Sequence, residues 1–392
     1  MAPAAVLQRP TLSTLGFVDP QLDPTRRHAV VRATAPRPLP REPRDLEAQI
    51  HGAGRTRDLD AWVRETHTTS LLVLDNALGA GSVVHEWYAD GVRPESLLLG
   101  ASMTKSALAH LVGIALTRGA LDLEDPVVRH VPELEGSGYA ACTVEHLLTM
   151  TTGAAWVEDH RDATGPASRL LSCFLPRVPE EGEERARLEG DDSRSLLVRV
   201  GPQDPPGTRW EYSTADSQVL DWVRERATGA TYAQALGDLW ERLGCVHDAV
   251  VAVDAEGVAL AGGGLAACAE DWARLAALEL DGTAYDERLL SLDWVAASSR
   301  PARPFTAPGR LPSSITTHAG FGYHWWPLDD AGRQVTSDGS RGQFGYVDRD
   351  LGVTVVKTSL WPYDDAQVDR QQRDLSYLGL PLIAAATATR RT

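Results

Sequence analysis

Lysine is almost absent from this chain. Of its 38 basic residues only Lys105 and Lys357 are lysines, so each of the two needs a specific explanation. Basic residues are outnumbered by 54 acidic ones, and the net charge of −16 argues against nucleic acid as a main partner. The four cysteines lie tens of residues apart and form no C-x-x-C pair, which excludes the usual spacing of a zinc site or a disulfide framework.

Long hydrophobic runs are missing as well. No stretch of 18 apolar residues occurs, and residues 1–20 lack the unbroken apolar segment of a secretory signal peptide. We therefore expect a soluble, cytoplasmic protein without membrane contacts. The chain has no G-x-G-x-x-G, P-loop or H-E-x-x-H pattern, so it gives no indication of a nucleotide or metal cofactor. With 392 residues, of which 43% are hydrophobic, it can build one large domain or two moderate ones.

Two hydrophobic periodicities indicate a β element that is split around a helical region. Apolar alternation and β-branched runs predict strands at 70–75, 83–88, 321–326, 343–347 and 353–358. Helical spacing predicts helices at 102–118, 143–150, 215–228, 231–243, 269–280 and 364–390. We therefore predict an α/β (α+β) protein with an antiparallel sheet flanked by terminal helices and an inserted all-helical region.

This order of elements implies three parts of the chain. Residues 1–45 are rich in Pro and Arg and are expected to form an extended arm that lies on the body. Residues 46–100 and 245–392 are expected to build a discontinuous sheet domain, and residues 101–244 a mainly helical domain. The acidic segment 179–195 has no apolar face, so we interpret it as a solvated loop, with a substrate lid as the alternative.

One of the two lysines follows a serine by three residues, at the start of a predicted helix. Positions i and i+3 share a helix face, so the Lys105 amine can reach the Ser102 hydroxyl. Free backbone N–H groups in that first turn favour an anion beside Ser102, such as the one that forms when a carbonyl is attacked. Lys105 can act as a base near neutral pH only if burial or a nearby cation lowers its pKa. The alternative is a surface lysine beside an ordinary helix-starting serine.

A second motif is Tyr212-Ser213-Thr214, between a turn-rich segment and a predicted helix. A tyrosine held on that loop can relay the proton of an attacking hydroxyl to the leaving group, if its oxygen faces Ser102 and Lys105. Taken alone, a tyrosine on a loop is more often structural. The motif therefore supports a function only together with its neighbours.

A third motif is Arg341-Gly342-Gln343, at the start of a predicted strand. A glycine there allows the backbone to lie close to a substrate. The Gln343 N–H can then join the N–H of Ser102 as a second donor to an oxyanion. As a lone tripeptide this motif is weak.

In this order the three motifs resemble the serine β-lactamase and penicillin-recognising superfamily, in particular its class C and esterase branch. The likeness covers roughly residues 65–390 and includes the segments DPVVRHVPELEGSGYAACTVEHLLTMTTG (125–153) and GGGLAACAEDWARLAALELDG (262–282). Within the branch the chain is most similar to the 6-aminohexanoate-dimer (nylon-oligomer) hydrolases, also through KTSLWP at 357–362. The resemblance implies a β-lactamase-like fold.

The same resemblance implies roles for individual residues. Ser102 would be the nucleophile, Lys105 its base and Tyr212 the proton relay, with an oxyanion hole formed by the backbone of Ser102 and Gln343. No metal or organic cofactor is implied. The implied substrate-binding positions are Thr214, Arg341, Gly342, His160 and Gly262.

Four positions depart from the family pattern. Thr214 stands where Asn or Ser is usual, and its hydroxyl can still donate to a carbonyl. Arg341 stands where Lys or His is usual; it can bind a substrate carboxylate, but it cannot be a base because it never deprotonates. His160 and Gly262 align with a Tyr and an Asn that contact substrate in the nylon-oligomer enzymes. These changes put the amide substrate in question, and leave the hydrolytic machinery in place.

We therefore predict a serine hydrolase that cleaves small carboxylic esters or short amides through an acyl-enzyme on Ser102. The expected cytoplasmic location disfavours cell-wall substrates, so a D,D-peptidase or β-lactamase-type enzyme is the less favoured alternative. A non-catalytic ligand-binding or sensing member of the same fold is the other alternative, because the late motif has changed to Arg341. The expected partner is a small-molecule ester or amide, and the oligomeric state, including a homodimer, is left open.

Overall fold

The computed structural model describes residues 27–52, 54–76, 81–160, 162, 164–174, 192–304, 309–310, 318–361 and 366–389. Its strands are β1 (His28–Val31), β2 (Ile50–Gly52), β3 (Arg55–Arg57), β4 (Thr68–Asp75), β5 (Ser82–Tyr88), β6 (Leu98–Leu99), β7 (Trp210–Glu211), β8 (Ala249–Ala252), β9 (Leu265–Ala267), β10 (Thr283–Ala284), β11 (Glu287–Arg288), β12 (Arg303–Pro304), β13 (Gly309–Arg310), β14 (Gly320–Phe321), β15 (Trp326–Pro327), β16 (Gln334–Gly339), β17 (Gln343–Asp348) and β18 (Val353–Ser359).

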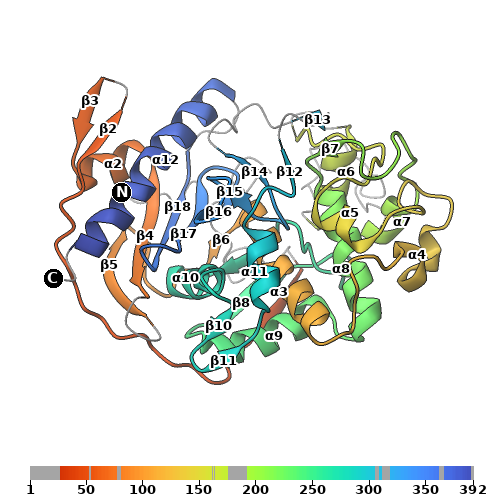
Figure 1. The fold of residues 1–392 in the computed structure, drawn as a ribbon, viewed down its shortest axis with the longest axis horizontal. Coiled ribbons are helices and arrows are strands. Elements are labelled where there is room, and N and C mark those ends of the chain that lie inside the picture. The colour runs from red at the N-terminus through yellow and green to blue at the C-terminus, as the bar shows by residue number, and fades with distance from the viewer. Residues whose placement is uncertain are drawn as a thin grey trace, which may run out of the picture.

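Helices cover the sheet and form most of the remaining body (Figure 1). They are α2 (Leu59–Glu65), the 3₁₀ turn η2 (Ala101–Met103), α3 (Thr104–Thr117), α4 (Val127–His130), the 3₁₀ turn η3 (Pro132–Leu134), α5 (Val144–Leu148), α6 (Pro166–Phe174), α7 (Ser193–Leu197), α8 (Thr214–Thr228), α9 (Tyr232–Leu243), α10 (Ala269–Ala277), α11 (Leu292–Ser298) and α12 (Ala366–Thr389). Within the described ranges, none of these helices has the length and apolar character needed to cross a lipid bilayer.

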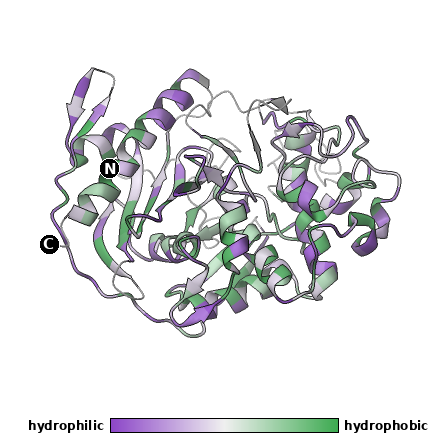
Figure 2. Cartoon of the chain, in the orientation of Figure 1, coloured by the Kyte–Doolittle hydropathy of each residue, from purple (hydrophilic) through white to green (hydrophobic). Residues whose placement is uncertain are grey.

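The large sheet has the strand order β15-β16-β17-β18-β4-β5, and all its neighbours are antiparallel. Successive side chains of a strand point to opposite faces. On β4, Leu71 and Val73 pack with α2 and α12, whereas Leu72 and Leu74 belong to the core on the other face, with α10. A strand that is buried on both faces reads as an unbroken apolar run, as this one does in the sequence. Figure 2 shows a hydrophobic stretch in β4, and α12 as a mixture of both kinds of residue.

A second sheet has the strand order β1-β8-β9-β6, and its edge strand β6 leads into η2 and α3. Directly after β6, Gly100 N donates to Leu265 O of β9 at 2.9 Å. Four residues later the Thr104 hydroxyl accepts a hydrogen bond from Leu265 N at 3.1 Å. The same residue of β9 therefore fixes both ends of the short turn η2 that carries Ser102.

The predicted fold class is confirmed, and most predicted helices and strands are found with shifted ends. The strand predicted at 321–326 is wrong, because β14 and β15 are separated by a turn that contains Gly322 and the left-handed His324, with φ 59°. The division into a sheet domain and an inserted helical domain stays a prediction. The segment 175–191, which includes most of the predicted acidic loop, lies outside the described residues.

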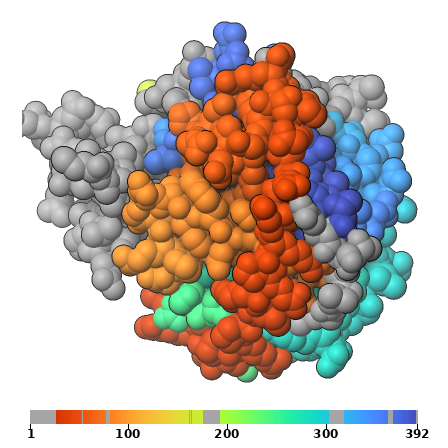
Figure 3. All heavy atoms as spheres, turned by 90° about the vertical axis from the view of Figure 1, so that its left-hand side faces the viewer, coloured from red at the N-terminus to blue at the C-terminus, as the bar shows by residue number. Residues whose placement is uncertain are grey.

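The N-terminal segment runs across one side of the body, where Figure 3 shows it in red and orange. Its strand β1 pairs with β8, and Arg41 forms a parallel bridge with Val83 of the edge strand β5. Glu42 N donates to Val83 O at 2.9 Å, and Arg44 N donates to Val84 O at 2.8 Å. The segment thus covers backbone groups at the edge of the large sheet, which would otherwise be open to pairing with other chains.

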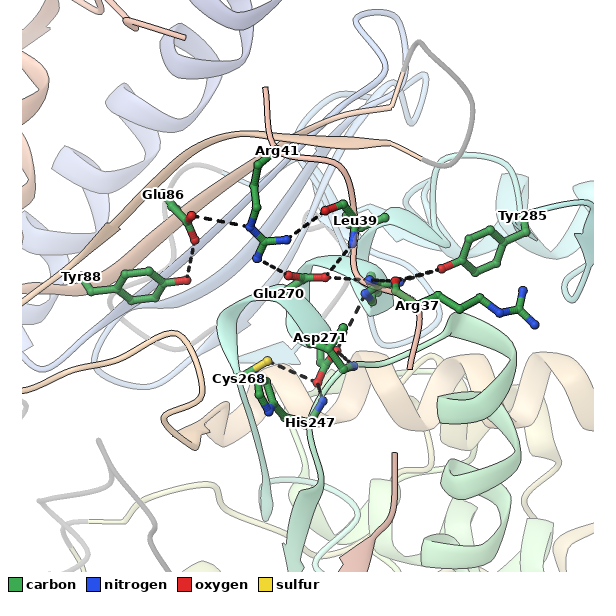
Figure 4. Close-up of polar contacts among 12 residues, drawn as sticks. Arg37, Leu39, Arg41, Glu86, Tyr88, His247, Cys268, Glu270, Asp271 and Tyr285 are labelled. Atoms are coloured by element: carbon green, nitrogen blue, oxygen red, sulfur yellow. Dashed lines mark hydrogen bonds and ion pairs between the residues drawn. The ribbon is translucent and has the colours of Figure 1, made fainter. Parts of the chain in front are cut away.

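A buried ion-pair network fastens this segment to α10 (Figure 4). Glu270 accepts hydrogen bonds from Arg41 Nη2 and Arg274 Nη2, each at 2.6 Å. Leu39 N donates to the same carboxylate at 3.3 Å, and Arg274 also donates to Arg37 O at 2.5 Å. Burial opposes a charge on Glu270, but the hydrogen bonds from Arg274 and Arg41 hold the pKa of this carboxyl below its usual value.

Loss of the Glu270 carboxylate should destabilise the protein. We expect Glu270→Ala to lower the free energy of unfolding by about 3 kcal/mol, because the buried Arg274 loses its nearest counter-charge. Glu86→Ala is the matched control, since the Glu86 side chain is 35% exposed and its carboxylate lies 3.7 Å from Arg41 Nε. Its loss should cost less than about 1 kcal/mol. Urea denaturation measures both values, and equal losses would contradict the role given to Glu270.

Candidate active site

Ser102 and Lys105 lie in contact where η2 meets α3. Lys105 Nζ lies 3.1 Å from Ser102 Oγ and 3.0 Å from Thr214 Oγ1, and it donates to Gly262 O at 2.7 Å. The Lys105 residue is only 2% exposed, whereas Ser102 is partly exposed. The alternative of a surface lysine is therefore wrong. Gly262, which was predicted to bind substrate, contributes its carbonyl to the lysine.

The environment of Lys105 favours the neutral amine. Burial lowers the pKa of Lys105 to about 8, although the nearby Glu158 carboxylate acts in the opposite direction. An ordinary lysine holds its proton until about pH 10.4. The neutral amine is therefore a minority form at neutral pH, but it is far more populated than in an ordinary lysine.

The backbone in front of Ser102 is strained. Ala101 has φ 46°, in the left-handed region that residues with a side chain rarely adopt. Such a conformation persists only where the surroundings fix it, and it is enriched at functional sites. Here Gly100 packs under Trp272, so that a methyl group on Gly100 would lie 2.4 Å from the indole ring.

Tyr212 covers the lysine amine with its ring. Lys105 Nζ lies 4.9 Å from the centroid of the Tyr212 ring. Trp326 stacks with the Tyr212 ring, with ring centroids 5.7 Å apart and an interplanar angle of 23°. Phe321 and Trp210 complete this aromatic cluster. The structure thus brings the predicted relay residue beside the predicted base.

The late motif forms the tight turn between β16 and β17. Arg341 and Gly342 have φ values of 66° and 92°. A methyl group on Gly342 would lie 2.1 Å from the Trp361 ring, so this position requires glycine for both its conformation and its space. Arg341 is 8% exposed, which places its guanidinium in a largely buried setting.

The strands on either side of this turn lie against η2. Gly339, the residue paired with Gln343, has no room for a side chain, since a methyl group there would lie 2.2 Å from Gly100 O and 3.1 Å from Met103 N. Gln343 is fully buried and its side-chain amide donates to Ser359 O at 2.8 Å. The Gln343 backbone is therefore held near the turn that carries Ser102, and its role as an oxyanion donor stays a prediction.

Glu158 is a site residue that the sequence analysis missed. Its carboxylate accepts hydrogen bonds from Thr214 N at 2.9 Å, Thr214 Oγ1 at 2.5 Å and Trp156 Nε1 at 2.6 Å. His160 Nε2 lies 3.1 Å from the same carboxylate. Burial alone would raise the pKa of Glu158, but His160, Lys105 and the Thr214 backbone lower it to about 2. His160 thus contacts Glu158. Its contact with substrate stays a prediction.

His324 is a second missed residue near the site. Its ring bridges two elements, since Nε2 lies 2.9 Å from Ser217 Oγ and Nδ1 lies 2.9 Å from Leu148 O. Its carbonyl accepts a hydrogen bond from Ser106 Oγ at 2.8 Å. Burial, with a contribution from Lys105, lowers the pKa of His324 to about 3, so the ring stays neutral. In the part of the chain that the structure describes, no group of His, Cys, Asp and Glu side chains is arranged to hold a metal ion.

Comparison with known sequences gives a consistent result. Residues 77–378 match the family model described as Beta-lactamase. The chain is 32% identical over 322 residues to the 6-aminohexanoate-dimer hydrolase of Paenarthrobacter ureafaciens, which covers 80% of this chain and 78% of that protein. It is 31% identical over 153 residues to the esterase EstB of Burkholderia gladioli, which covers 38% of this chain and 36% of that one.

Solved structures share the fold. A protein from Bacillus anthracis, whose name likens it to 6-aminohexanoate-dimer hydrolase, matches with a TM-score of 0.74 and 18% identity over 90% of both chains. EstCE1, a hydrolase with promiscuous acyltransferase activity, matches with a TM-score of 0.58 and 19% identity over 81% of this chain and 98% of that one. These matches confirm the predicted β-lactamase-like fold.

Proposed function

Because the chain belongs to the beta-lactamase family and is a serine hydrolase, we propose that it cleaves small carboxylic esters or short amides through an acyl-enzyme on Ser102. The observation that carries this proposal is the buried Lys105 amine, 3.1 Å from Ser102 Oγ. A neutral amine at that distance can take the hydroxyl proton while the oxygen attacks a carbonyl carbon. Family membership supports this enzyme over the non-catalytic alternative.

The reaction proceeds in two halves. Ser102 Oγ bonds to the carbonyl carbon, its proton passes to Lys105, and the new oxyanion accepts hydrogen bonds from the backbone N–H groups of Ser102 and Gln343. The bond to the alcohol or amine then breaks, and that group takes the proton through the Tyr212 hydroxyl. A water molecule attacks the resulting ester on Ser102, with Lys105 and Tyr212 again moving the proton, and releases the acid.

Two features support the class of substrate. The guanidinium of Arg341 is charged at every accessible pH and can bind a carboxylate through two parallel hydrogen bonds. The aromatic cluster around Tyr212 offers an apolar surface beside the reacting groups. A short substrate with an apolar chain, and with a carboxylate at its far end, fits both features. The relatives named 6-aminohexanoate-dimer hydrolase and esterase EstB support a hydrolase of this kind.

A panel of four substrates tests this proposal. Short-chain p-nitrophenyl esters, 6-aminohexanoate dimer, a cephalosporin and a D-alanyl peptide are assayed side by side, with Ser102→Ala as the background. We expect the ester or the amide dimer to be turned over fastest, because Arg341 and the aromatic cluster suit short linear substrates. Fastest turnover of the cephalosporin or the D-alanyl peptide would instead support the alternative of a β-lactamase or D,D-peptidase.

A further inference from the structure

The hydrogen bonds around Lys105 define a direction for its lone pair. A neutral amine has two N–H donors and a single lone pair. Among the described residues, Lys105 Nζ has three hydrogen-bond partners: Gly262 O at 2.7 Å, Thr214 Oγ1 at 3.0 Å and Ser102 Oγ at 3.1 Å. The carbonyl can only accept, so it takes one N–H. The lone pair therefore points either at Ser102 or at Thr214, and the Thr214 hydroxyl decides which.

Glu158 fixes the orientation of the Thr214 hydroxyl. An ionised carboxylate can only accept hydrogen bonds, and Glu158 Oε1 lies 2.5 Å from Thr214 Oγ1. The Thr214 hydroxyl therefore donates its single hydrogen to Glu158. Thr214 Oγ1 can offer only a lone pair to Lys105, so it takes the second N–H of the amine. The lone pair of the amine is left facing Ser102.

We propose that Glu158 is a positioning residue, which acts through Thr214 to aim the lone pair of the Lys105 amine at Ser102 Oγ. The inference rests on the proposed function of Ser102 and Lys105. Glu158 is suited to this task because Trp156 Nε1 at 2.6 Å and Thr214 N at 2.9 Å hold its other oxygen in place. A carboxylate held from both oxygens cannot turn away from Thr214.

The charge of Glu158 also acts on the amine. Its carboxylate raises the pKa of Lys105 against the larger effect of burial. The other groups that face this cluster are His160 on Glu158, Asp216 at the start of α8, His324 between α3 and α8, and the Tyr212 ring. Catalysis requires the neutral amine, so the rise of activity with pH follows the pKa of Lys105. Removal of the carboxylate charge should move that rise to lower pH.

The test compares the pH profile of Glu158→Gln with that of the wild-type protein. The value of kcat/KM for a p-nitrophenyl ester is measured across the neutral and alkaline range. We expect the rising limb to move by about 1 pH unit toward lower pH, because an opposite charge near the amine is lost. We also expect the alkaline plateau to fall at least about 10-fold, because the amide NH₂ group lets the Thr214 hydroxyl compete for the lone pair.

Two further variants complete the experiment. Glu279→Gln is the matched control, because Glu279 is a buried glutamate that contacts Ser298 and Arg349 outside the site. Glu279→Gln should keep the rising limb of the pH profile and the alkaline plateau of the wild-type protein. Thr214→Val retains the Glu158 charge but removes the hydroxyl that transmits its effect, and its plateau should fall at least about 10-fold. This second variant tests the proposal even if Glu158→Gln does not fold.

The outcomes distinguish the positioning role of Glu158 from the proposed function of Ser102. The positioning role would be overturned by either of two results. One is a rising limb of the pH profile that does not move in folded Glu158→Gln. The other is an alkaline plateau at the wild-type level in Glu158→Gln or in Thr214→Val. Wild-type protein that turns over esters without acylation of Ser102 would instead overturn the proposed function itself. Acylation of wild-type Ser102, together with a shifted limb and lowered plateaus, supports both.

Discussion

Ester turnover by Ser102→Ala is expected to fall at least about 10³-fold while the protein stays folded. The substitution removes the oxygen that attacks the carbonyl, and leaves Lys105 beside a methyl group without a proton to accept. Initial rates of p-nitrophenyl butyrate hydrolysis measure the loss, and circular dichroism checks the fold. Turnover close to that of the wild-type protein would rule out Ser102 as the nucleophile.

Ser137→Ala is the matched control for this substitution. Ser137 is a buried serine outside the site, and its hydroxyl donates to Leu134 O at 2.7 Å and accepts from Tyr139 N at 3.1 Å, within a turn of its own. Its replacement should cost about 1 kcal/mol of stability and leave turnover almost unchanged. A similar loss of activity in both variants would point to a general structural effect.

Lys105→Met should lower kcat/KM by about 10²- to 10⁴-fold, the usual contribution of a general base. Wild-type activity should rise as the pH passes about 8, where Lys105 loses its proton, and the variant should lack this limb. The unfolded chain keeps the lysine proton until about pH 10.4, so the buried charge opposes folding at neutral pH, and stability rises with pH between the two values. Removing the amine should therefore lower activity by this factor without lowering the stability at neutral pH.

The other lysine of the chain provides the control for Lys105→Met. Lys357 is also fully buried, and its amine lies 5.4 Å from the Trp62 ring and 5.3 Å from the Trp361 ring, on the face of the sheet that packs with α12. Burial lowers its pKa well below the usual value. Lys357→Met should keep the rising limb of the pH profile in its wild-type position. If the rising limb moves in Lys357→Met and stays in place in Lys105→Met, the assignment of Lys105 as the base is wrong.

The sequence could predict those parts of the site that depend on local geometry. Three residues separate Ser102 from Lys105, and a helix places residues at that spacing on one face regardless of the rest of the fold. The strand β4 was predictable for a similar reason, since burial on both faces demands a continuous apolar run. The strand predicted at 321–326 fails because the left-handed backbone at His324 interrupts it, which its side chains do not indicate.

The sequence could not predict contacts that exist only after the chain has folded. Glu158 lies in the polar stretch WVEDHRD, in which the neighbouring acids look equivalent. Packing of this stretch against the start of α8 selects Glu158, because only there do Thr214 N and Oγ1 both reach a carboxylate. The contact of Glu270 with Arg41 is likewise set by the path of the N-terminal segment along β5.

The proposed reaction depends on a buried amine that, in its uncharged form, makes the Ser102 oxygen reactive near neutral pH. Peptide mass spectrometry tests it most directly, after brief exposure of the wild-type protein to a fluorophosphonate or to a p-nitrophenyl ester followed by an acid quench. We expect a single added mass on the peptide that contains Ser102, absent from Ser102→Ala and strongly reduced in Lys105→Met. Continued ester turnover with the added mass on another residue, or with no added mass under any quench condition, would contradict it.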